Sequence, residues 1–223
     1  MNQQSQTVTR TNESILATNK VLRNTYTLLS MTLVFSALMA GVSMMMELPR
    51  SIGLFSSIGA IVLLWFVIPR TANSASGIFW VFAMTGLLGL GLGPMLNAYL
   101  QLPNGGELIM TAMGGTGVIF LGLSGYALTS RKDFSFMGGF LMAGIMVVFV
   151  AGIAAAIFDL SGVALAVSAG FILLMSGLIL YETSNIIHGG ETNYIMATVS
   201  LYVSIYNLFT SLLHLLGALG GDD

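Results

Sequence analysis

The order of apolar and polar positions divides the chain into seven long apolar segments joined by short polar connections. The segments are residues 25–46, 52–68, 78–100, 108–128, 136–158, 163–187 and 194–216. A helix needs about 20 residues, within a range of about 17 to 25, to cross the hydrocarbon core of a bilayer. Because lipid offers the backbone no hydrogen-bonding partner, each such segment must pair its own N–H and C=O groups, which favours helices. The pattern therefore predicts an all-α membrane protein with seven transmembrane helices.

The composition agrees with a lipid environment. Hydrophobic residues make up 56% of the chain and charged residues only 7%, whereas soluble domains carry about 25% charged residues. Cysteine is absent, which excludes disulfides and thiolate chemistry. The net charge of −2 gives no reason to expect nucleic acid as a partner. We expect one membrane domain, residues 25–217, between a flexible cytoplasmic tail (residues 1–24) and a short periplasmic tail (residues 218–223).

The basic residues predict the orientation, because cytoplasmic loops are enriched in lysine and arginine. A cytoplasmic N-terminus would put six of them on the inner side and leave only Arg50 outside. These six are Arg10, Lys20, Arg23, Arg70, Arg131 and Lys132. With seven crossings, the C-terminus would be periplasmic.

Few side chains are available for chemistry inside the membrane. Both lysines lie outside the predicted spans, so no Schiff-base site is expected. His188 and His214 are the only histidines, fewer than the three ligands of a typical catalytic zinc; we therefore expect no metal, cofactor or enzymatic activity. The remaining candidate is Glu182, within the sixth span. Ionisable residues at such depth usually face a bundle interior or a cavity, and two interpretations stay open: a structural carboxyl, or a site that binds a proton or cation.

The seventh span carries a polar stripe. Five polar residues recur at intervals of four, three, four and three, which places them on one face of a helix. They are Ser200, Ser204, Asn207, Ser211 and His214. A polar face in lipid should point inward, either as a partner for Glu182 or as ordinary contacts between helices. The turn that joins the two spans contains His188 and Glu191, and its shortness predicts that these spans are antiparallel neighbours.

Two further motifs concern packing and a less favoured alternative. Gly89 and Gly93 form a G-x-x-x-G pair, and small residues at this spacing allow close approach of helices, here most simply within the chain. "GLSG" around Ser124 resembles the nucleophile motif of rhomboid intramembrane proteases. Such a serine needs a histidine within hydrogen-bonding reach, and His188 is the candidate. A bare tetrapeptide match is weak evidence.

The C-terminal third resembles a known family. "YETSNIIHGGETNYIMATVSLYVSIYNLFTSLLHLLG" (residues 181–217) is similar to the signature of the transmembrane Bax inhibitor motif family. "NKVLRNTYTLLSMTL", "TANSASGIF", "GLGPMLNAYL" and "LTSRKDFSFMGG" resemble its bacterial YccA branch.

The resemblance implies a fold in which six helices wrap around a central seventh. In calcium-leak members of the family two aspartates on the last two spans share a proton; the matching positions here are Glu182 and Ser204. A hydroxyl in place of the second carboxylate weakens the expectation of a pH-sensitive calcium or proton leak. The YccA branch implies a different role: an inner-membrane protein that binds and modulates the membrane AAA protease FtsH as an inhibitor-like substrate.

Overall fold

The computed structural model describes residues 2–220 of the chain, with side chains described from Thr18 onward. The elements are α1 (Asn2–Met45), α2 (Arg50–Val62), the π-helix η1 (Leu63–Val67), α3 (Ile68–Thr71), α4 (Ser76–Leu100), α5 (Gly105–Ser130), the 3-10 helix η2 (Ser135–Met137), α6 (Gly138–Ile157), α7 (Ser161–Ile187) and α8 (Tyr194–Leu219). Within this described part, seven helical stretches are long and apolar enough to cross a membrane, so the predicted fold class is confirmed. Residues 2–24 of the predicted N-terminal tail form the first part of α1, and the predicted C-terminal tail begins at the end of α8. The flexibility of the first tail and the sides of the membrane assigned to both remain predictions.

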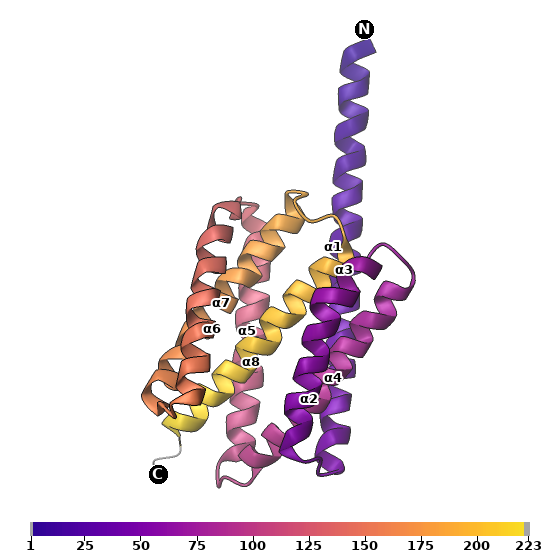
Figure 1. The fold of residues 1–223 in the computed structure, drawn as a ribbon. Coiled ribbons are helices and arrows are strands. Elements are labelled where there is room, and N and C mark those ends of the chain that lie inside the picture. Colours follow the sequence, from indigo (N-terminus) through magenta and orange to yellow (C-terminus); the bar gives the residue numbers. More distant parts are fainter. Residues whose placement is uncertain (1, 221–223) are drawn as a thin grey trace.

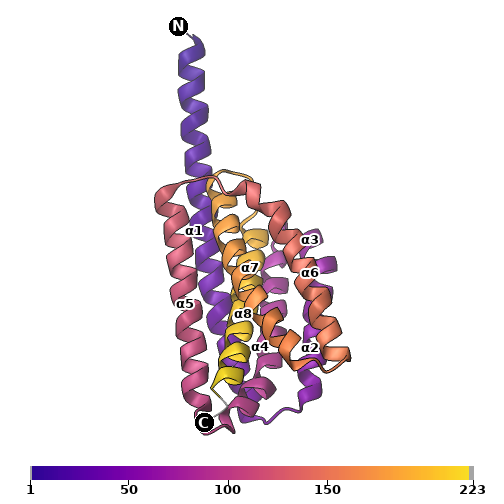
Figure 2. The ribbon, with the colours of Figure 1, turned by 90° about the vertical axis from the view of Figure 1, so that its left-hand side faces the viewer.

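The bundle is arranged around α8. This helix crosses the middle of the molecule and packs against α1, α4, α5 and α7. The outer helices α2 and α6 pack on these neighbours and not on α8 itself: α2 packs mainly on α4, and α6 mainly on α7. Figure 2 shows α5 and α6 on either side of α7. The predicted antiparallel packing of the last two spans is confirmed by the extensive contact between α7 and α8.

The joint between α1 and α4 shows why α4 carries glycines and a proline. A methyl group added at Gly89 would meet the backbone carbonyl group of Ser36, whose carbon would lie 3.0 Å away, so the two helices meet at their backbones there. Pro94 has no N–H, which leaves the carbonyl of Leu90 without its helical partner. The hydroxyl of Ser43 on α1 donates to this carbonyl at 2.8 Å. The chain thereby satisfies a polar group that lipid could not, and α4 continues to Leu100.

The second span is the least regular of the seven. It runs from Arg50 to Thr71 through α2, η1 and α3, with the π-helical turn directly before Pro69. A widened turn is a common way for a helix to accommodate an irregularity, and a proline removes one helical hydrogen bond. The span is therefore longer than the apolar run of residues 52–68 that predicted it.

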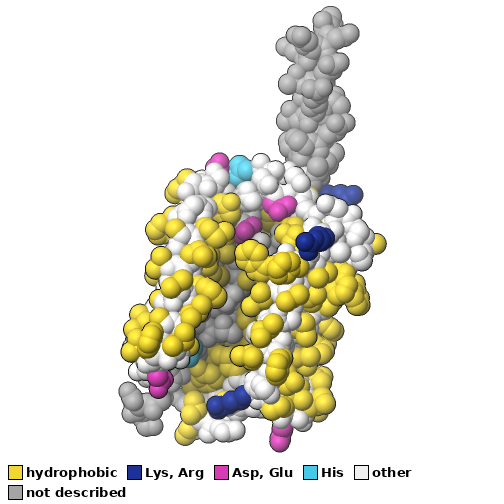
Figure 3. All heavy atoms as spheres, viewed as in Figure 1, with side chains coloured by type: hydrophobic (Ala, Val, Ile, Leu, Met, Phe, Trp, Pro, Cys, Tyr) yellow, Lys and Arg dark blue, Asp and Glu magenta, His cyan; other side chains and the backbone are white. Residues whose placement is uncertain are grey.

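Charged and apolar side chains are separated along the bundle. In Figure 3 hydrophobic side chains cover the sides, and charged side chains gather towards the two ends. Large apolar residues are exposed on the outer helices, such as Phe55 on α2 and Met142 on α6. We call the end that holds Arg23, Arg70 and Arg131 the basic end. The cytoplasmic location of this end remains a prediction.

Candidate functional site

Glu182 lies on α7, one and a half turns from its C-terminal end, and faces α8. The side chain of Ser200 on α8 lies near its carboxyl group. The positions of the two residues in their helices explain why they lie near each other. Glu182 is five residues before the last residue of α7, and Ser200 is six residues after the first residue of α8. The two side chains therefore lie at nearly the same depth.

Ser204, the position matched to the family's second aspartate, makes a different contact. It lies one helical turn deeper than Ser200, is completely buried, and donates its hydroxyl proton to the carbonyl of Ser200 at 2.9 Å. Among the described residues the structure thus brings Glu182 to Ser200 rather than to Ser204.

A second carboxylate does approach Glu182, from the turn between α7 and α8. Glu191 is close enough for its charge to act on Glu182, and its Oε1 accepts a hydrogen bond from the backbone N–H of Asn193 at 2.7 Å. Asn193 is the N-cap of α8: its Oδ1 accepts from the N–H groups of Ile195 and Met196. The sequence predicts Glu191 in the turn but did not lead us to the cap that positions it, although "ETN" before an apolar run is a recognisable helix start.

The polar stripe of α8 divides into two faces. Ser204 and Ser211 are buried, whereas Ser200 and Asn207 are partly exposed and His214 is exposed. The inward orientation is observed for Ser204 and Ser211, and for the other three residues it remains a prediction. At 3.6 residues per turn the five positions lie within a sector of about 80°, with Ser204 and Ser211 towards one edge and Asn207 and His214 towards the other.

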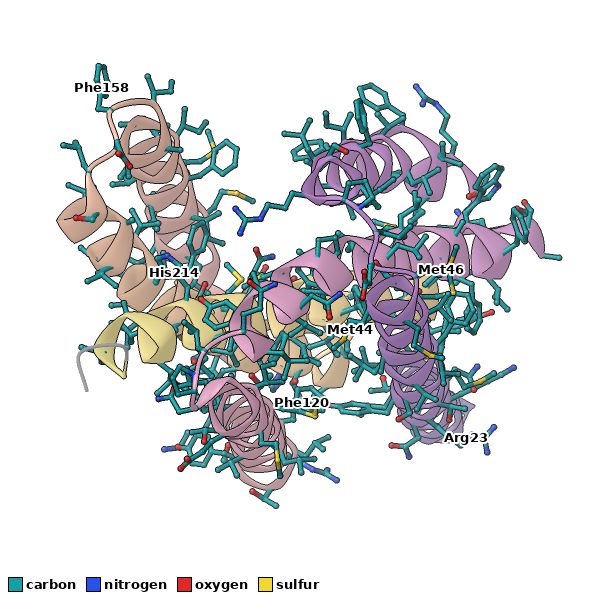
Figure 4. The ribbon with its side chains drawn as sticks, turned by 90° about the horizontal axis from the view of Figure 1, so that it is seen from below. Arg23, Met44, Met46, Phe120, Phe158 and His214 are labelled. Carbon is teal, nitrogen blue, oxygen red and sulfur yellow. The ribbon has the colours of Figure 1, made fainter. Side chains whose placement is uncertain are left out.

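His214 lies near the end of α8 that is remote from the basic end. Its Nδ1 lies 2.9 Å from Ser168 Oγ on α7, and Figure 4 shows it beside that helix. Because the single proton of the Ser168 hydroxyl is donated to the carbonyl of Ala164 at 3.0 Å, Ser168 can only accept from Nδ1–H. His214 and Asp159 line the same pocket of about 370 Å³. No group of three or more metal-binding side chains occurs among the described residues.

His188 fastens the end of α7 to the turn between α5 and α6. Its Nδ1 lies 2.8 Å from the carbonyl oxygen of Ser184, and its Nε2 lies 3.2 Å from the carbonyl oxygen of Arg131. In the same turn, the backbone N–H of Ser135 donates to Asp133 and holds the pKa of this carboxyl below its usual value.

The serine of the rhomboid-like motif has no histidine beside it. Ser124 is buried, and its hydroxyl lies 3.3 Å from Thr183 Oγ1, which lies in turn 3.3 Å from Tyr26 Oη. Since both ring nitrogens of His188 face other groups, the Ser–His pair that the protease alternative requires is not formed.

The hydroxyl of Tyr202, at the centre of the bundle, was not predicted from the sequence to have a structural role. Tyr202 on α8 is buried, and Ser36 Oγ on α1 lies 2.6 Å from its Oη. Tyr202 also donates to the carbonyl of Thr85 on α4 at 3.4 Å. The sequence shows a tyrosine among apolar residues, but nothing in it indicates that this tyrosine joins three helices.

Comparison with known proteins agrees with this architecture. The profile of the family described as "Inhibitor of apoptosis-promoting Bax1" matches residues 18–221. A protein of Escherichia coli K12 named "Modulator of FtsH protease YccA" is 54% identical over 209 residues, which cover 94% of each chain. A protein of Escherichia coli O6:H1 with the same identity and coverage is named "Inner membrane protein YccA".

A third relative extends the match to the full length. An "Uncharacterized membrane protein" of Vibrio cholerae is 49% identical over 223 residues, all of both chains. With a family match over most of the chain and relatives at this identity, the chain belongs to the Bax inhibitor family of membrane proteins.

Proposed function

We propose that the protein is a multi-pass inner-membrane protein that binds and modulates an FtsH-type protease as an inhibitor-like substrate. The observation that carries this proposal is the 54% identity, over 94% of both chains, to a protein named as a modulator of FtsH protease. The name of the second Escherichia coli relative supports the inner membrane as the location.

The proposed mechanism combines a segment that can be gripped with a domain that resists extraction. Residues 1–17 are polar and lack aromatic side chains, a composition typical of segments that do not fold alone. The bundle behind them is joined across three helices at Tyr202. An ATP-driven protease that engages the N-terminus would meet this bundle after a short distance and be delayed there.

The test is competition for the protease in native membranes. We expect the full-length protein to co-purify with the protease and to slow degradation of a second membrane substrate. Deletion of residues 2–17 should abolish the slowing, while deletion of residues 221–223 serves as a matched terminal control. Unchanged competition after the N-terminal deletion would remove this segment from the mechanism. If the full-length protein does not co-purify, the partner itself is wrong.

The proposed orientation has a cytoplasmic N-terminus and a periplasmic C-terminus. The chain contains no cysteine, so single cysteines can be introduced without background. A cysteine at Lys132 should react with a membrane-impermeant maleimide only after the cells are opened, and a cysteine at Arg50 should react in cells whose outer membrane alone is permeable. The reverse result would invert the topology.

A second candidate function is an acid-dependent leak of protons or calcium past Glu182. Two observations favour it: Glu182 lies within a membrane span near the side chain of Ser200, and a second carboxylate, Glu191, lies in the turn that follows the same helix. Purified protein in liposomes should then show flux that rises as pH falls and is lost in Glu182→Gln. Equal flux from the wild type and this variant excludes the site.

The geometry also identifies where an added carboxylate should act. Ser200→Asp would place a second acid against Glu182, whereas Ser204→Asp would bury one a turn deeper, against the backbone. Two close carboxylates bind divalent cations better than one. We expect calcium binding to strengthen in Ser200→Asp and not in Ser204→Asp; the opposite order would restore the family's pairing.

A further inference from the structure

A cavity of about 390 Å³ opens at the basic end, between α1, α5 and α7. In Figure 2 the ends of α5 and α7 lie beside α1 at this end of the bundle. Its apolar lining residues are Leu22, Leu128 and Ile187, and each belongs to the terminal two turns of a membrane span. The cavity, which we call the basic chamber, therefore lies at the level where headgroups give way to hydrocarbon.

The basic chamber has a floor one helical turn deeper in the membrane. Tyr26, Ser124 and Thr183 each lie four residues along their helices from one of the three apolar lining residues. The Oγ1 atom of Thr183 lies 3.3 Å from Tyr26 Oη and 3.3 Å from Ser124 Oγ. Phe120 extends from α5 towards α1 (Figure 4), and its ring centroid lies 6.1 Å from that of Tyr26. These contacts close the chamber towards the membrane interior.

The chamber also reaches the lipid, between α1 and α5. The helix α1 packs mainly on α4 and α8, and α5 mainly on α8 and α7, so the two form separate walls. Leu128 lines the chamber and is also 37% exposed. The apolar part of the wall therefore continues onto the lipid-facing surface of α5.

Arg131 supplies the cationic group of the chamber, from an uncommon backbone conformation. It follows the last residue of α5 with a φ of 49°, in the left-handed region that favours glycine. The turn is held from α7, because the carbonyl oxygen of Arg131 lies 3.2 Å from His188 Nε2 and Ser184 donates to the carbonyl of Lys132 at 3.1 Å. A glycine would adopt this conformation with less strain, but it could not bring a positive charge to the chamber.

The charge around the chamber favours an anion. Within the described part of the chain, no carboxylate is among the lining residues. Asp133, the acid closest in sequence to Arg131, accepts a hydrogen bond from the N–H of Ser135 in its own turn. Lys20 and Arg23 are exposed on the segment of α1 that lines the chamber. Such charges raise the local concentration of anions, and a guanidinium can donate two parallel hydrogen bonds to one phosphate group.

The mixed lining indicates which anion fits. A free phosphate ion gains nothing from three aliphatic side chains, whereas the glycerol and first acyl carbons of a phospholipid would lie against them. A zwitterionic headgroup would need a partner for its ammonium group, and the described lining offers it no carboxylate. Basic pockets between membrane helices are known to bind acidic headgroups. The lining therefore matches a phospholipid with a net negative charge.

We propose that the basic chamber binds one anionic phospholipid, whose phosphate pairs with Arg131 and whose glycerol and upper acyl carbons lie against the three aliphatic residues. The lipid comes from the leaflet on the side of the basic end. The site is separate from Glu182 and does not depend on the proposed function.

Native mass spectrometry of the full-length protein in a neutral detergent tests the site, because it counts the lipid molecules bound to each protein. The probes are phosphatidylglycerol and phosphatidylethanolamine with identical acyl chains. The test variant is Arg131→Gly, which removes the charge where the backbone favours glycine, so the fold should tolerate it. The matched control is Arg70→Gln, which removes one positive charge at the same end from a residue outside the chamber.

We expect the first phosphatidylglycerol to bind the wild type about tenfold more tightly than phosphatidylethanolamine. Arg131→Gly should abolish this preference and Arg70→Gln should keep it. Arg131→Lys, which retains the charge without the paired donors, should show an intermediate preference. Inorganic phosphate at the concentration of the lipid should not displace the phosphatidylglycerol.

Four results would overturn the proposal. Equal binding of the two lipids, or an unchanged preference in Arg131→Gly, would exclude Arg131 as the partner of an acidic headgroup. Equal losses in Arg131→Gly and Arg70→Gln would show attraction to a basic surface without a site. Displacement of the lipid by inorganic phosphate would show a site for a free anion.

Discussion

The close approach of α1 and α4 predicts a large effect from a single methyl group. In Gly89→Ala the added carbon would lie 2.9 Å from Ser36 Oγ and 3.0 Å from its carbonyl carbon. Backbone atoms cannot turn aside, so the helices must separate. Such overpacking costs about 1–3 kcal/mol. The shift also strains the 2.6 Å hydrogen bond between Ser36 and Tyr202, and interhelical bonds of this kind contribute about 0.6 kcal/mol.

The control is Gly114→Ala on α5, where an added methyl group meets nothing within 4 Å. Both variants gain the same helix propensity, up to about 1 kcal/mol, and this contribution cancels when the two are compared. The free energy of unfolding, measured by titration with a denaturing detergent in mixed micelles, should be about 2 kcal/mol lower in Gly89→Ala than in Gly114→Ala. Equal values would refute the packing of α1 on α4 described above.

Three further predictions concern the turns at the basic end. Asn193→Ala should lower the free energy of unfolding by about 1–2 kcal/mol in the same titration, because it removes the N-cap of α8 and the hydrogen bond to the carbonyl of Ala72. His188→Ala should cost about 1 kcal/mol, since two partly solvated hydrogen bonds are lost; no change would mean that the turn between α5 and α6 is not fastened there. The lowered pKa of Asp133 means that its contribution to stability is complete above about pH 4 and is lost as pH falls further; Asp133→Asn should remove this part of the pH dependence, and an unchanged acid titration would contradict it.

The seven spans were predictable because the physics that selects them acts on each segment separately. Lipid demands about 20 apolar residues and internal backbone pairing, and both requirements are visible in the sequence. The ends were placed less well where polar residues continue a helix beyond the apolar run, as at Arg50–Thr71. The hydroxyl of Ser43, which replaces the N–H that Pro94 lacks, lies 51 positions away in the sequence, and no local pattern could reveal it.

The candidate site shows why the pair of aspartates found in other family members cannot simply be transferred to Glu182 and Ser204. The rise along the helices places Ser204 a full turn deeper than Glu182, and Ser200 is the serine of α8 whose side chain lies near Glu182. The charge of Glu191 could not be placed without knowing that Asn193 caps α8. The periodicity of the α8 stripe was correct, but periodicity shows which residues share a face and not what lies against that face.

Affinity purification of the full-length protein from native membranes tests the central claim most directly. If the protein is a protease modulator, an FtsH-type protease should be recovered with it, in an amount that falls when residues 2–17 are removed. Recovery of the protein without the protease, in membranes where the protease is present and active, would contradict the account.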